Sequence, residues 1–282
     1  MNKYLSLIKF SHTIFAMPFA FIGFFLATKT HVFEWVTLLY VILCMLFARS
    51  AAMAFNRYID RDIDKKNKRT ARVREIPNGT ISAKNTLIFV IINSILFITT
   101  TYFINTICFT LSPIALGIIL GYSYTKRFTA LCHLILGLGL ALAPIGGYLA
   151  VCGEFKLIPI LFSSSVLFWV SGFDIIYALQ DQQFDKNQKL HSIPVLMGKK
   201  NALRFSKILH LISVIILAFA GDLAVFGKWY WIGLSIFTGL LIYQHALVKH
   251  NNLEKINLAF FTTNGIASII FGAFVIFDII SK

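Results

Sequence analysis

Long apolar segments alternate with short polar connections along the whole chain. Each of nine segments holds roughly the 20 apolar residues that one crossing of a bilayer requires. The predicted spans are 11–29, 35–56, 85–104, 106–124, 130–150, 157–180, 205–226, 229–248 and 257–280. No linker separates them, so the pattern predicts a single all-α domain over residues 1–282, a polytopic membrane protein whose nine transmembrane helices form one bundle. The first ten residues favour a short amphipathic helix at the membrane surface.

Composition supports the membrane class. Hydrophobic residues make up 57% of the chain and charged residues only 13%, with a mean hydropathy of +0.76, whereas a soluble domain carries about 25% charged residues. The N-terminus is basic, but no small-residue cleavage site follows it. We therefore expect this segment to belong to the mature chain and not to a removed signal peptide.

The cysteines and histidines do not suggest a metal site. Cys44, Cys108, Cys132 and Cys152 are scattered in or beside apolar segments, which argues against disulfides and structural zinc. His12, His133 and His210 are expected to be packed or interfacial residues and not ligands. In the fifth span, Gly146 and Gly147 follow Pro144 and predict a kink or a close helix contact.

The distribution of positive charge predicts the topology. The formal net charge is +14. In a membrane protein such an excess indicates topology, anionic lipid or an anionic substrate, and we expect no nucleic-acid partner. The N-terminus and the connections after the second, fourth, sixth and eighth spans, counted with Lys207 at the start of the seventh span, hold 21 of the 26 Lys and Arg residues. The positive-inside rule therefore predicts a cytoplasmic N-terminus and an external C-terminus, in agreement with an odd number of spans.

Acidic residues concentrate at two places on the predicted cytoplasmic side. Six of the twelve Asp and Glu residues fall in the stretches NRYIDRDID and DIIYALQDQQFD. Each stretch holds a D-x-x-x-D pair, Asp60 with Asp64 and Asp181 with Asp185, and residues four apart share one helix face. Like charges at that spacing repel, so a cation is expected between them. Carboxylates together with substrate phosphates suit Mg²⁺, and two facing pairs would hold one diphosphate between metal ions.

Three more polar residues share these helix faces. Asn56 precedes Asp60 by one turn, Arg49 precedes Asn56 by seven residues, and Asp174 precedes Asp181 by seven. Arg49 and Asp174 are the only charged residues in their predicted spans. A charge at mid-span costs about 2.5–3.5 kcal/mol on insertion scales, so both residues indicate a functional site.

The charged stretches allow other interpretations. A solvated cytoplasmic loop that balances its own Lys and Arg is the non-functional alternative. A calcium-binding EF-hand fails, because Lys65 stands where glycine is required and Ala71 where a bidentate Glu is required. Lys126 and Arg127 suit phosphate contacts and interface anchoring equally well, and Tyr122 equally suits an interfacial aromatic belt.

At these residues the chain resembles the UbiA superfamily of intramembrane aromatic prenyltransferases. The first motif of the superfamily, N-x-x-x-D-x-x-x-D followed by K-R-T and P-x-G, is matched by Asn56, Asp60, Asp64, Lys68, Arg69, Thr70, Pro77 and Gly79. The second motif, Y-A-x-x-D-x-x-x-D, is matched by Tyr177, Ala178, Asp181 and Asp185, and the Y-x-x-x-K-R element by Tyr122, Lys126 and Arg127. The approach Arg49-Ser50-Ala51 and the segments KFSHTIFAMPFAFIG and HSIPVLMG extend the resemblance over nearly the whole chain.

Two departures from the pattern leave alternatives open. Arg57 stands where many members have Asp. It resembles a subgroup with N-R-x-x-D-R-x-x-D that includes 4-hydroxybenzoate polyprenyltransferases and menaquinone prenyltransferases of the futalosine route. The acceptor is therefore open between 4-hydroxybenzoate and 1,4-dihydroxy-6-naphthoate. The segment RTARVREIPNG is one residue longer than the usual loop, which leaves open whether Arg72 or Arg74 contacts phosphate.

The resemblance implies transfer of a polyprenyl group from its diphosphate to a small carboxylated aromatic acceptor in quinone biosynthesis. It implies one Mg²⁺ on Asn56, Asp60 and Asp64 and a second on Asp181 and Asp185, with Asp60, Asp64, Asp174, Asp181 and Asp185 as catalytic residues. Lys68, Arg69, Arg72, Lys126, Arg127 and Lys189 would bind the diphosphate, and Arg49, Tyr122 and Tyr177 would bind the acceptor or stabilise the allylic cation. Asp174 is expected to handle the hydroxyl or ring proton of the acceptor. The implied location is the lipid of the bacterial cytoplasmic (inner) membrane, with the active site near the cytoplasmic face.

Alternatives outside this reaction have less support. An ion-coupled transporter would use Arg49 and Asp174 as a relay, but transporters place coupling sites near the midplane on broken helices. CDP-alcohol phosphotransferases also carry Asp-rich motifs at the membrane edge, but their D-G-x-x-A-R motif is absent here. Within the superfamily, a haem or chlorophyll acceptor is a further alternative.

Overall fold

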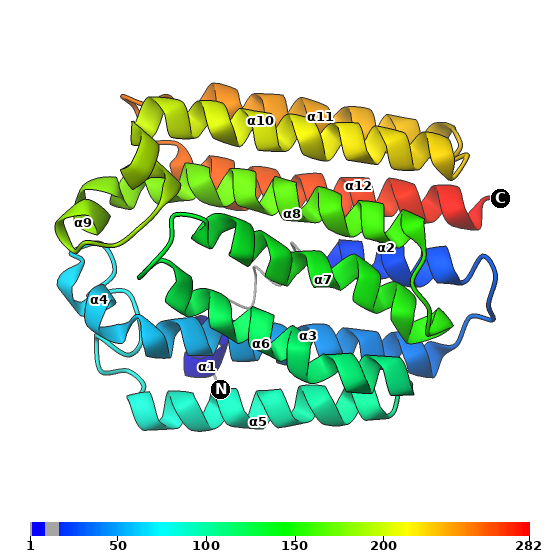
Figure 1. The fold of residues 1–282 in the computed structure, drawn as a ribbon, viewed down its shortest axis with the longest axis horizontal. Coiled ribbons are helices and arrows are strands. Elements are labelled where there is room, and N and C mark those ends of the chain that lie inside the picture. The colour runs from blue at the N-terminus through cyan, green and yellow to red at the C-terminus, as the bar shows by residue number, and fades with distance from the viewer. Residues whose placement is uncertain (1, 9–16) are drawn as a thin grey trace.

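The structure is a computed structural model that describes residues 2–8 and 17–282, and every regular element within them is a helix (Figure 1). The all-α prediction is therefore confirmed for the described residues. The start of the first predicted span, 11–16, lies outside them, as does His12.

The helices run side by side in one bundle (Figure 1). Their bounds are α1 (Asn2–Leu7), α2 (Met17–Ala27), α3 (Trp35–Ile59), α4 (Arg61–Lys66), α5 (Ala83–Tyr102), α6 (Thr106–Thr125), α7 (Cys132–Cys152), α8 (Leu157–Ala178), the 3₁₀ turn η2 (Leu179–Asp181), α9 (Gln182–Asn187), α10 (Ile193–Leu223), α11 (Lys228–Leu247), the π-helical turn η3 (Leu258–Thr263) and α12 (Asn264–Ile280). The predicted spans from 35–56 to 157–180, and the last two, agree with these helices within four residues.

The predicted bounds of the seventh span were wrong, because α10 begins twelve residues earlier than 205. Ser192 caps this helix by accepting a hydrogen bond at Oγ from the Val195 N–H, and Pro194 lies in its first turn. At Gly198 the backbone has φ 75° and ψ 159°, which kinks the helix and suits glycine. Because polar residues around this kink interrupt the apolar run, hydropathy alone does not detect the first turn of α10.

Seven of the described helices are long and apolar enough to cross a membrane. The helix α2 is apolar but only 11 residues long, and α11 is not among the seven. The count of nine crossings and the cytoplasmic N-terminus therefore stay predictions. The helix expected in the first ten residues is present as α1, but it packs inward, because Leu7 is fully buried against Ala54, Ile81 and Val90.

Aromatic side chains from four helices meet at the centre of the largest core cluster. Trp169 of α8 packs on Phe19 of α2 and Phe237 of α11, with ring centroids 5.2 and 5.6 Å away, and Phe237 packs on Phe271 of α12 at 5.2 Å. These tilted and edge contacts are favourable for aromatic pairs and bury a large area per residue. They hold α2, α8, α11 and α12 together as the scaffold behind the polar end of the bundle.

Small residues let α7 approach its neighbours closely. A Cβ atom at Gly147 would lie 2.1 Å from the Ala20 carbonyl oxygen of α2, and a Cβ atom at Gly137 would lie 2.4 Å from the Ser171 Oγ of α8. The close helix contact predicted at Gly146 and Gly147 is therefore made by Gly147. It fixes the depth at which α7 lies between α2 and α8.

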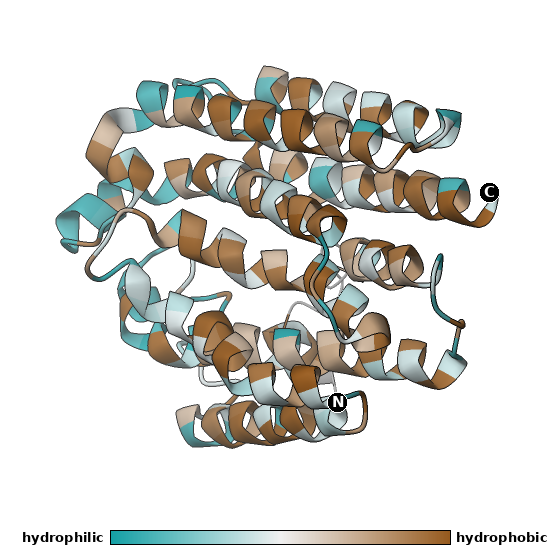
Figure 2. Ribbon diagram, turned by 45° about the vertical axis from the view of Figure 1, so that its right-hand side comes forward, coloured by the Kyte–Doolittle hydropathy of each residue, from teal (hydrophilic) through white to brown (hydrophobic). Residues whose placement is uncertain are grey.

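The two acidic stretches lie at the same end of the bundle. The short helices α4 and α9, which carry them, are neighbours at the end opposite the C-terminus (Figure 1). Figure 2 shows hydrophilic residues gathered at that end and mainly hydrophobic helices leading away from it. The fold thus brings together residues more than a hundred positions apart in the chain.

We predict that Gly147→Ala destabilises the fold and that Gly146→Ala does not. The Gly147 variant forces a methyl group into the Ala20 carbonyl, and overpacking of this kind costs about 1–3 kcal/mol. A Cβ atom at Gly146 meets nothing within 4 Å, so alanine there gains up to about 1 kcal/mol of helix propensity. Thermal unfolding midpoints in detergent measure the difference, and equal midpoints would show that the α2–α7 contact is not tight.

Candidate active site

The first acidic stretch begins where α3 ends. Asp60 leaves helical geometry with φ −87° and ψ 2°, and its carboxylate is buried. The Asn56 Nδ2 donates a hydrogen bond to Asp60 Oδ2 at 3.1 Å. From the end of α6, the Arg127 Nη2 donates to Asp60 Oδ1 at 3.1 Å and to the Ile59 carbonyl at 2.9 Å. Arg127 therefore balances the charge of Asp60 and holds the end of α3 against the end of α6.

Asp64, one turn further along in α4, is also buried and pairs with Arg74. Burial raises the pKa of the Asp64 carboxyl above its usual range, while the Arg74 guanidinium opposes that rise. The structure therefore places Arg74, and not Arg72, against the acids of the first motif.

The loop after the first acidic stretch reaches the second one. The Arg69 guanidinium forms a two-pronged contact with the Asp181 carboxylate, with its Nε 3.0 Å from Oδ1. The Asn67 Nδ2 donates to the same oxygen at 3.0 Å, and the Asn67 Oδ1 accepts from the Arg69 backbone N–H. Bidentate contacts of this kind fix geometry as well as charge. The two acidic stretches are thus joined by direct hydrogen bonds.

Asp185 completes the group of buried carboxylates. Its side chain is buried in α9, and no hydrogen-bond donor reaches it within residues 2–8 and 17–282. The charges of Lys126, Asp181 and Asp60 all act on it. Asp185 is therefore the point at which the second acidic stretch approaches Asp60 of the first, and Lys126 supplies the largest opposing charge.

The donor set is suited to Mg²⁺. No three His, Cys, Asp or Glu side chains in the described part of the chain converge as a ready-made metal cage. Mg²⁺ does not need one, since it is usually held by one or two carboxylates together with waters and substrate phosphates. A buried carboxylate without a donor, Asp185, and a second carboxylate beside an amide, Asp60 with Asn56, provide such oxygens. The residues present therefore fit the ion.

The remaining predicted phosphate ligands lie at the rim. Lys68, Arg72 and Lys189 are exposed, and none forms an ion pair with the acids among the residues described here. Lys189 has a left-handed backbone, with φ 54°. The structure thus brings Arg69, Lys126 and Arg127 to the carboxylates and leaves the other three at the surface.

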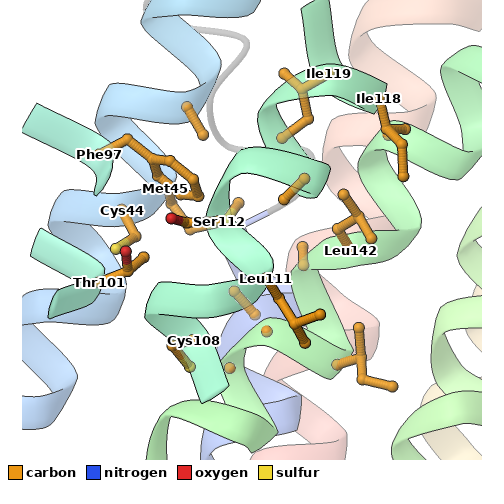
Figure 3. Close-up of a pocket in the computed structure, with 18 of the residues that line it drawn as sticks. Cys44, Met45, Phe97, Thr101, Cys108, Leu111, Ser112, Ile118, Ile119 and Leu142 are labelled. Atoms are coloured by element: carbon orange, nitrogen blue, oxygen red, sulfur yellow. The ribbon is translucent and has the colours of Figure 1, made fainter. Parts of the chain in front are cut away.

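An apolar cavity lies between helices of the bundle. It has a volume of about 410 Å³ and is lined by α3, α5, α6 and α7 (Figure 3). Cys44, Phe97, Leu111, Ile118 and Leu142 are among its apolar lining residues.

Arg49 and Tyr122 also line this cavity and supply its polar groups. The Arg49 Nε is buried without a hydrogen-bond partner in the described residues. The charges of Arg49, Asp60 and Asp174 all act on the Tyr122 hydroxyl. The two charges predicted at mid-span therefore both lie near Tyr122.

Asp174 has a partner that the sequence did not indicate. Its Oδ2 lies 2.6 Å from the His133 Nδ1 of α7. His133 was expected to be a packed residue, and it is buried, but it also makes this contact with the only charged residue of α8. A local sequence pattern could not pair them, since they are 41 positions apart.

Tyr177 is enclosed by other side chains. Its ring packs on Phe260 with centroids 4.2 Å apart, and the Arg69 guanidinium lies over it at 5.5 Å. The Tyr177 hydroxyl accepts a hydrogen bond from the Arg69 Nη1 at 3.1 Å. Tyr177 thus holds Arg69 toward Asp181.

Comparison with known proteins identifies relatives over most of the chain. Residues 16–266 match the UbiA prenyltransferase family. A 4-hydroxybenzoate octaprenyltransferase of Aliivibrio fischeri (strain MJ11) is 30% identical over 245 residues, which cover 84% of this chain and 82% of the relative. A 4-hydroxybenzoate octaprenyltransferase of Thiobacillus denitrificans is 27% identical over 245 residues, covering 86% and 82%.

Solved structures share the fold. An apo UbiA homolog from Aeropyrum pernix K1 superposes with a TM-score of 0.85 at 30% identity, covering 95% of this chain and 98% of the homolog. A UbiA homolog from Archaeoglobus fulgidus bound to GPP and Mg²⁺ superposes with a TM-score of 0.76 at 25% identity, covering 99% and 100%.

We predict that Arg74→Gln destabilises the protein by about 3 kcal/mol at neutral pH, because it leaves a buried carboxylate unpaired. The loss should shrink with acidification. The folded-state pKa of Asp64 is raised above 3.8, so the protein loses stability as pH rises from 3.8 through this folded-state pKa and the carboxyl group becomes charged. Removal of Arg74 raises the folded-state pKa of Asp64 further and widens the pH range over which stability is lost. Unfolding midpoints measured across this pH range test the prediction.

Arg72→Gln is the matched control, because Arg72 is exposed on the same loop. Asp64→Asn combined with Arg74→Gln should recover part of the loss, since no unpaired charge remains. Equal destabilisation by both single variants at every pH would contradict the importance of the buried pair.

Proposed function

Because the chain belongs to the UbiA prenyltransferase family, we propose that it transfers a polyprenyl group from its diphosphate to a carboxylated aromatic acceptor of the 4-hydroxybenzoate type in quinone biosynthesis. The chain is a prenyltransferase and an integral membrane protein. One observation carries the proposal: Arg69 and Asn67, from the loop after the first acidic stretch, bond Asp181 of the second, so both stretches face one shared space.

The metal is assigned to the two acidic stretches. Asn56, Asp60 and Asp64 would hold one Mg²⁺, and Asp181 with Asp185 a second. When bound, the ions would neutralise the charge that develops on the departing diphosphate. An archaeal homolog bound to GPP and Mg²⁺ with the same fold supports this assignment.

The cations of the site would bind the diphosphate. Arg69, Arg74 and Arg127 already point their guanidinium groups into the acidic space, and Lys126 acts on Asp185. Guanidinium groups match phosphate oxygens in pairs. The exposed rim cations, Lys68, Arg72 and Lys189, would attract the substrate at longer range.

The polyprenyl chain would lie in the apolar cavity. A volume of about 410 Å³ falls within the usual range for ligand pockets, and its lining comes from apolar faces of α3, α5, α6 and α7. The cavity ends at Arg49 and Tyr122, close to the acids. The reactive end of the isoprenoid would thus meet the diphosphate site while its tail stays dry.

Arg49, Tyr122 and Asp174 would handle the acceptor. The buried Arg49, whose Nε lacks a partner, would bind the carboxylate of the acceptor. Tyr122 would stabilise the allylic cation by a cation–π contact, a role for which Tyr177 is less available because Arg69 and Phe260 cover it.

The proposed reaction has three steps, which together conserve atoms and electrons. The prenyl C–O bond breaks with its electron pair leaving on the diphosphate. A ring carbon of the acceptor then forms the new C–C bond with its π electrons. The proton that the acceptor loses passes to the Asp174 carboxylate.

A second acceptor, 1,4-dihydroxy-6-naphthoate of menaquinone biosynthesis, stays open, because the N-R-x-x-D-R-x-x-D subgroup that the chain resembles includes both kinds of prenyltransferase. Arg57, which stands where many family members have Asp, is buried in α3, and the charges of Asp64 and Glu75 act on it. It thus adds a cation beneath the first acidic stretch. For either acceptor, we place the protein in the bacterial cytoplasmic membrane with its active site near the cytoplasmic face, because the basic connections lie at the acidic end of the bundle.

We predict that Asp60→Ala and Asp181→Ala each abolish transfer while the protein still inserts into membranes. Asp62→Ala is the matched control, because the Asp62 side chain is 81% exposed. Membranes are incubated with Mg²⁺, labelled polyprenyl diphosphate and either 4-hydroxybenzoate or 1,4-dihydroxy-6-naphthoate. Chelation with EDTA should stop the reaction. Full activity in both variants would reject the metal assignment, and transfer only to a different acceptor would reject the proposed substrates.

We predict that Arg49→Met raises the KM for the aromatic acid by about tenfold or more, because a charge-assisted hydrogen bond contributes about 1.5–3 kcal/mol. The KM for the prenyl diphosphate should stay unchanged. Phenol, which lacks the carboxylate, provides the control, since the wild type and the variant should treat it alike. An unchanged KM for the aromatic acid would assign Arg49 to another role.

A further inference from the structure

The buried residue His133 contacts Asp174, to which we assign the proton that the acceptor releases. Asp174 Oδ2 lies 2.6 Å from the His133 Nδ1. The His133 side chain is 4% exposed, whereas that of Asp174 is 21% exposed. The carboxylate therefore has one protected oxygen, held by the histidine, and one more open side.

The backbone determines which nitrogen of His133 carries the proton. The Ile193 N–H donates to the His133 Nε2 at 3.4 Å. Since an N–H can only donate, Nε2 is the acceptor, and the proton of a neutral ring resides on Nδ1. His133 is therefore a hydrogen-bond donor to Asp174.

Two further hydrogen bonds fix the backbone of His133 and the segment that contacts its ring. The His133 carbonyl accepts a hydrogen bond from the Ser171 Oγ of α8 at 3.1 Å, across the close contact at Gly137. The segment that carries Ile193 is fixed to α6, because the His191 N–H donates to the Lys126 carbonyl at 2.7 Å. The position of the donor is thus set by α7, α8 and the start of α10 together.

The free side of Asp174 belongs to the acceptor region. Asp174 Oδ1 has no hydrogen-bond partner among the residues that the structure describes. The charge of Asp174 acts on the Tyr122 hydroxyl, and Tyr122 lines the apolar cavity. Asp174 does not itself line the cavity, so a ring bound there by Arg49 would approach it from the side of the Tyr122 hydroxyl.

We propose that His133 is a positioning residue for the transfer reaction: by donating from Nδ1 to Asp174 Oδ2, it orients Oδ1 to take the proton that the aromatic acceptor releases. The inference rests on the proposed function. It assigns a role to a residue outside both acidic stretches, and it explains why the one charge within α8 is stable in an apolar helix. A bonded carboxylate avoids most of the cost of an isolated one.

The test measures the ratio of prenyl groups that react with water to prenyl groups that are transferred to the aromatic ring. With purified enzyme, Mg²⁺, a polyprenyl diphosphate and 4-hydroxybenzoate, each prenyl group that ionises either alkylates the ring or reacts with water to give the prenyl alcohol. We expect His133→Gln to raise the alcohol-to-product ratio about tenfold, with the rate of diphosphate release little changed, because proton removal is impaired while ionisation is not. A merely structural defect would lower both products together.

Two matched variants control for size and burial. His133→Asn keeps an N–H near the position of Nδ1 and should stay within about threefold of the wild-type ratio. His210→Gln changes another buried histidine, whose Nε2 contacts the Trp169 carbonyl, and should leave the ratio unchanged. An equal increase in all three variants would overturn the proposal.

A double-mutant cycle with Asp174→Asn tests whether His133 acts through Asp174. We expect the double variant to match Asp174→Asn alone, because the histidine then has no carboxylate to orient. If the ratio in the double variant instead rises by the product of the two separate factors, the inference is overturned while the proposed function stays intact. If the wild type transfers no prenyl group to any aromatic acid, the proposed function fails first and the inference fails with it.

Discussion

Charge balance at the edge of an apolar bundle governs the arrangement of the site. Carboxylates that are buried without a counter-charge would be strongly destabilising or would take up protons. Here Asp60, Asp64 and Asp181 each contact a guanidinium group, from Arg127, Arg74 and Arg69 respectively. These arginines come from the end of α6 and from the loop after α4, so the ion pairs also determine how the ends of the helices meet. The same ion pairs therefore balance the charges of the site and fix the positions of the helix ends.

The apolar cavity and the acidic space are two different environments within one bundle. Carboxylates and guanidinium groups gather where the bundle meets water, whereas the cavity lies among apolar faces of four helices. A reaction that separates a diphosphate from a hydrocarbon needs both environments in contact, because one fragment is stabilised by charge and the other by exclusion of water. Tyr122 and Arg49 lie where the two environments meet.

Much of this structure follows from local sequence rules, and the remainder depends on contacts between distant residues. Hydropathy predicted seven of the spans within four residues, and the spacing of Asp60 with Asp64 placed both at one end of the bundle. The start of α10 was missed although the Ser192 cap and Pro194 were visible in the sequence, because polar residues around Gly198 interrupt the apolar run. The partners Arg74 and His133 carry no local signal, because tertiary packing alone decides which of several nearby cations or histidines meets a given acid.

The kink at Gly198 has a mechanical consequence. The short turn that precedes it is bonded to His133 through the Ile193 N–H and to Gln182 through the Pro194 carbonyl. The long segment that follows it exposes one apolar face, with Ile208, Leu211 and Phe219, and buries the other. Along that inner face, Ser206 Oγ donates to the Gly172 carbonyl and His210 Nε2 contacts the Trp169 carbonyl, so the long segment is fixed to α8. The change of direction at Gly198 therefore lets one helix satisfy two different alignments, the long segment lying along α8 and the preceding turn keeping its bonds to Gln182 and His133.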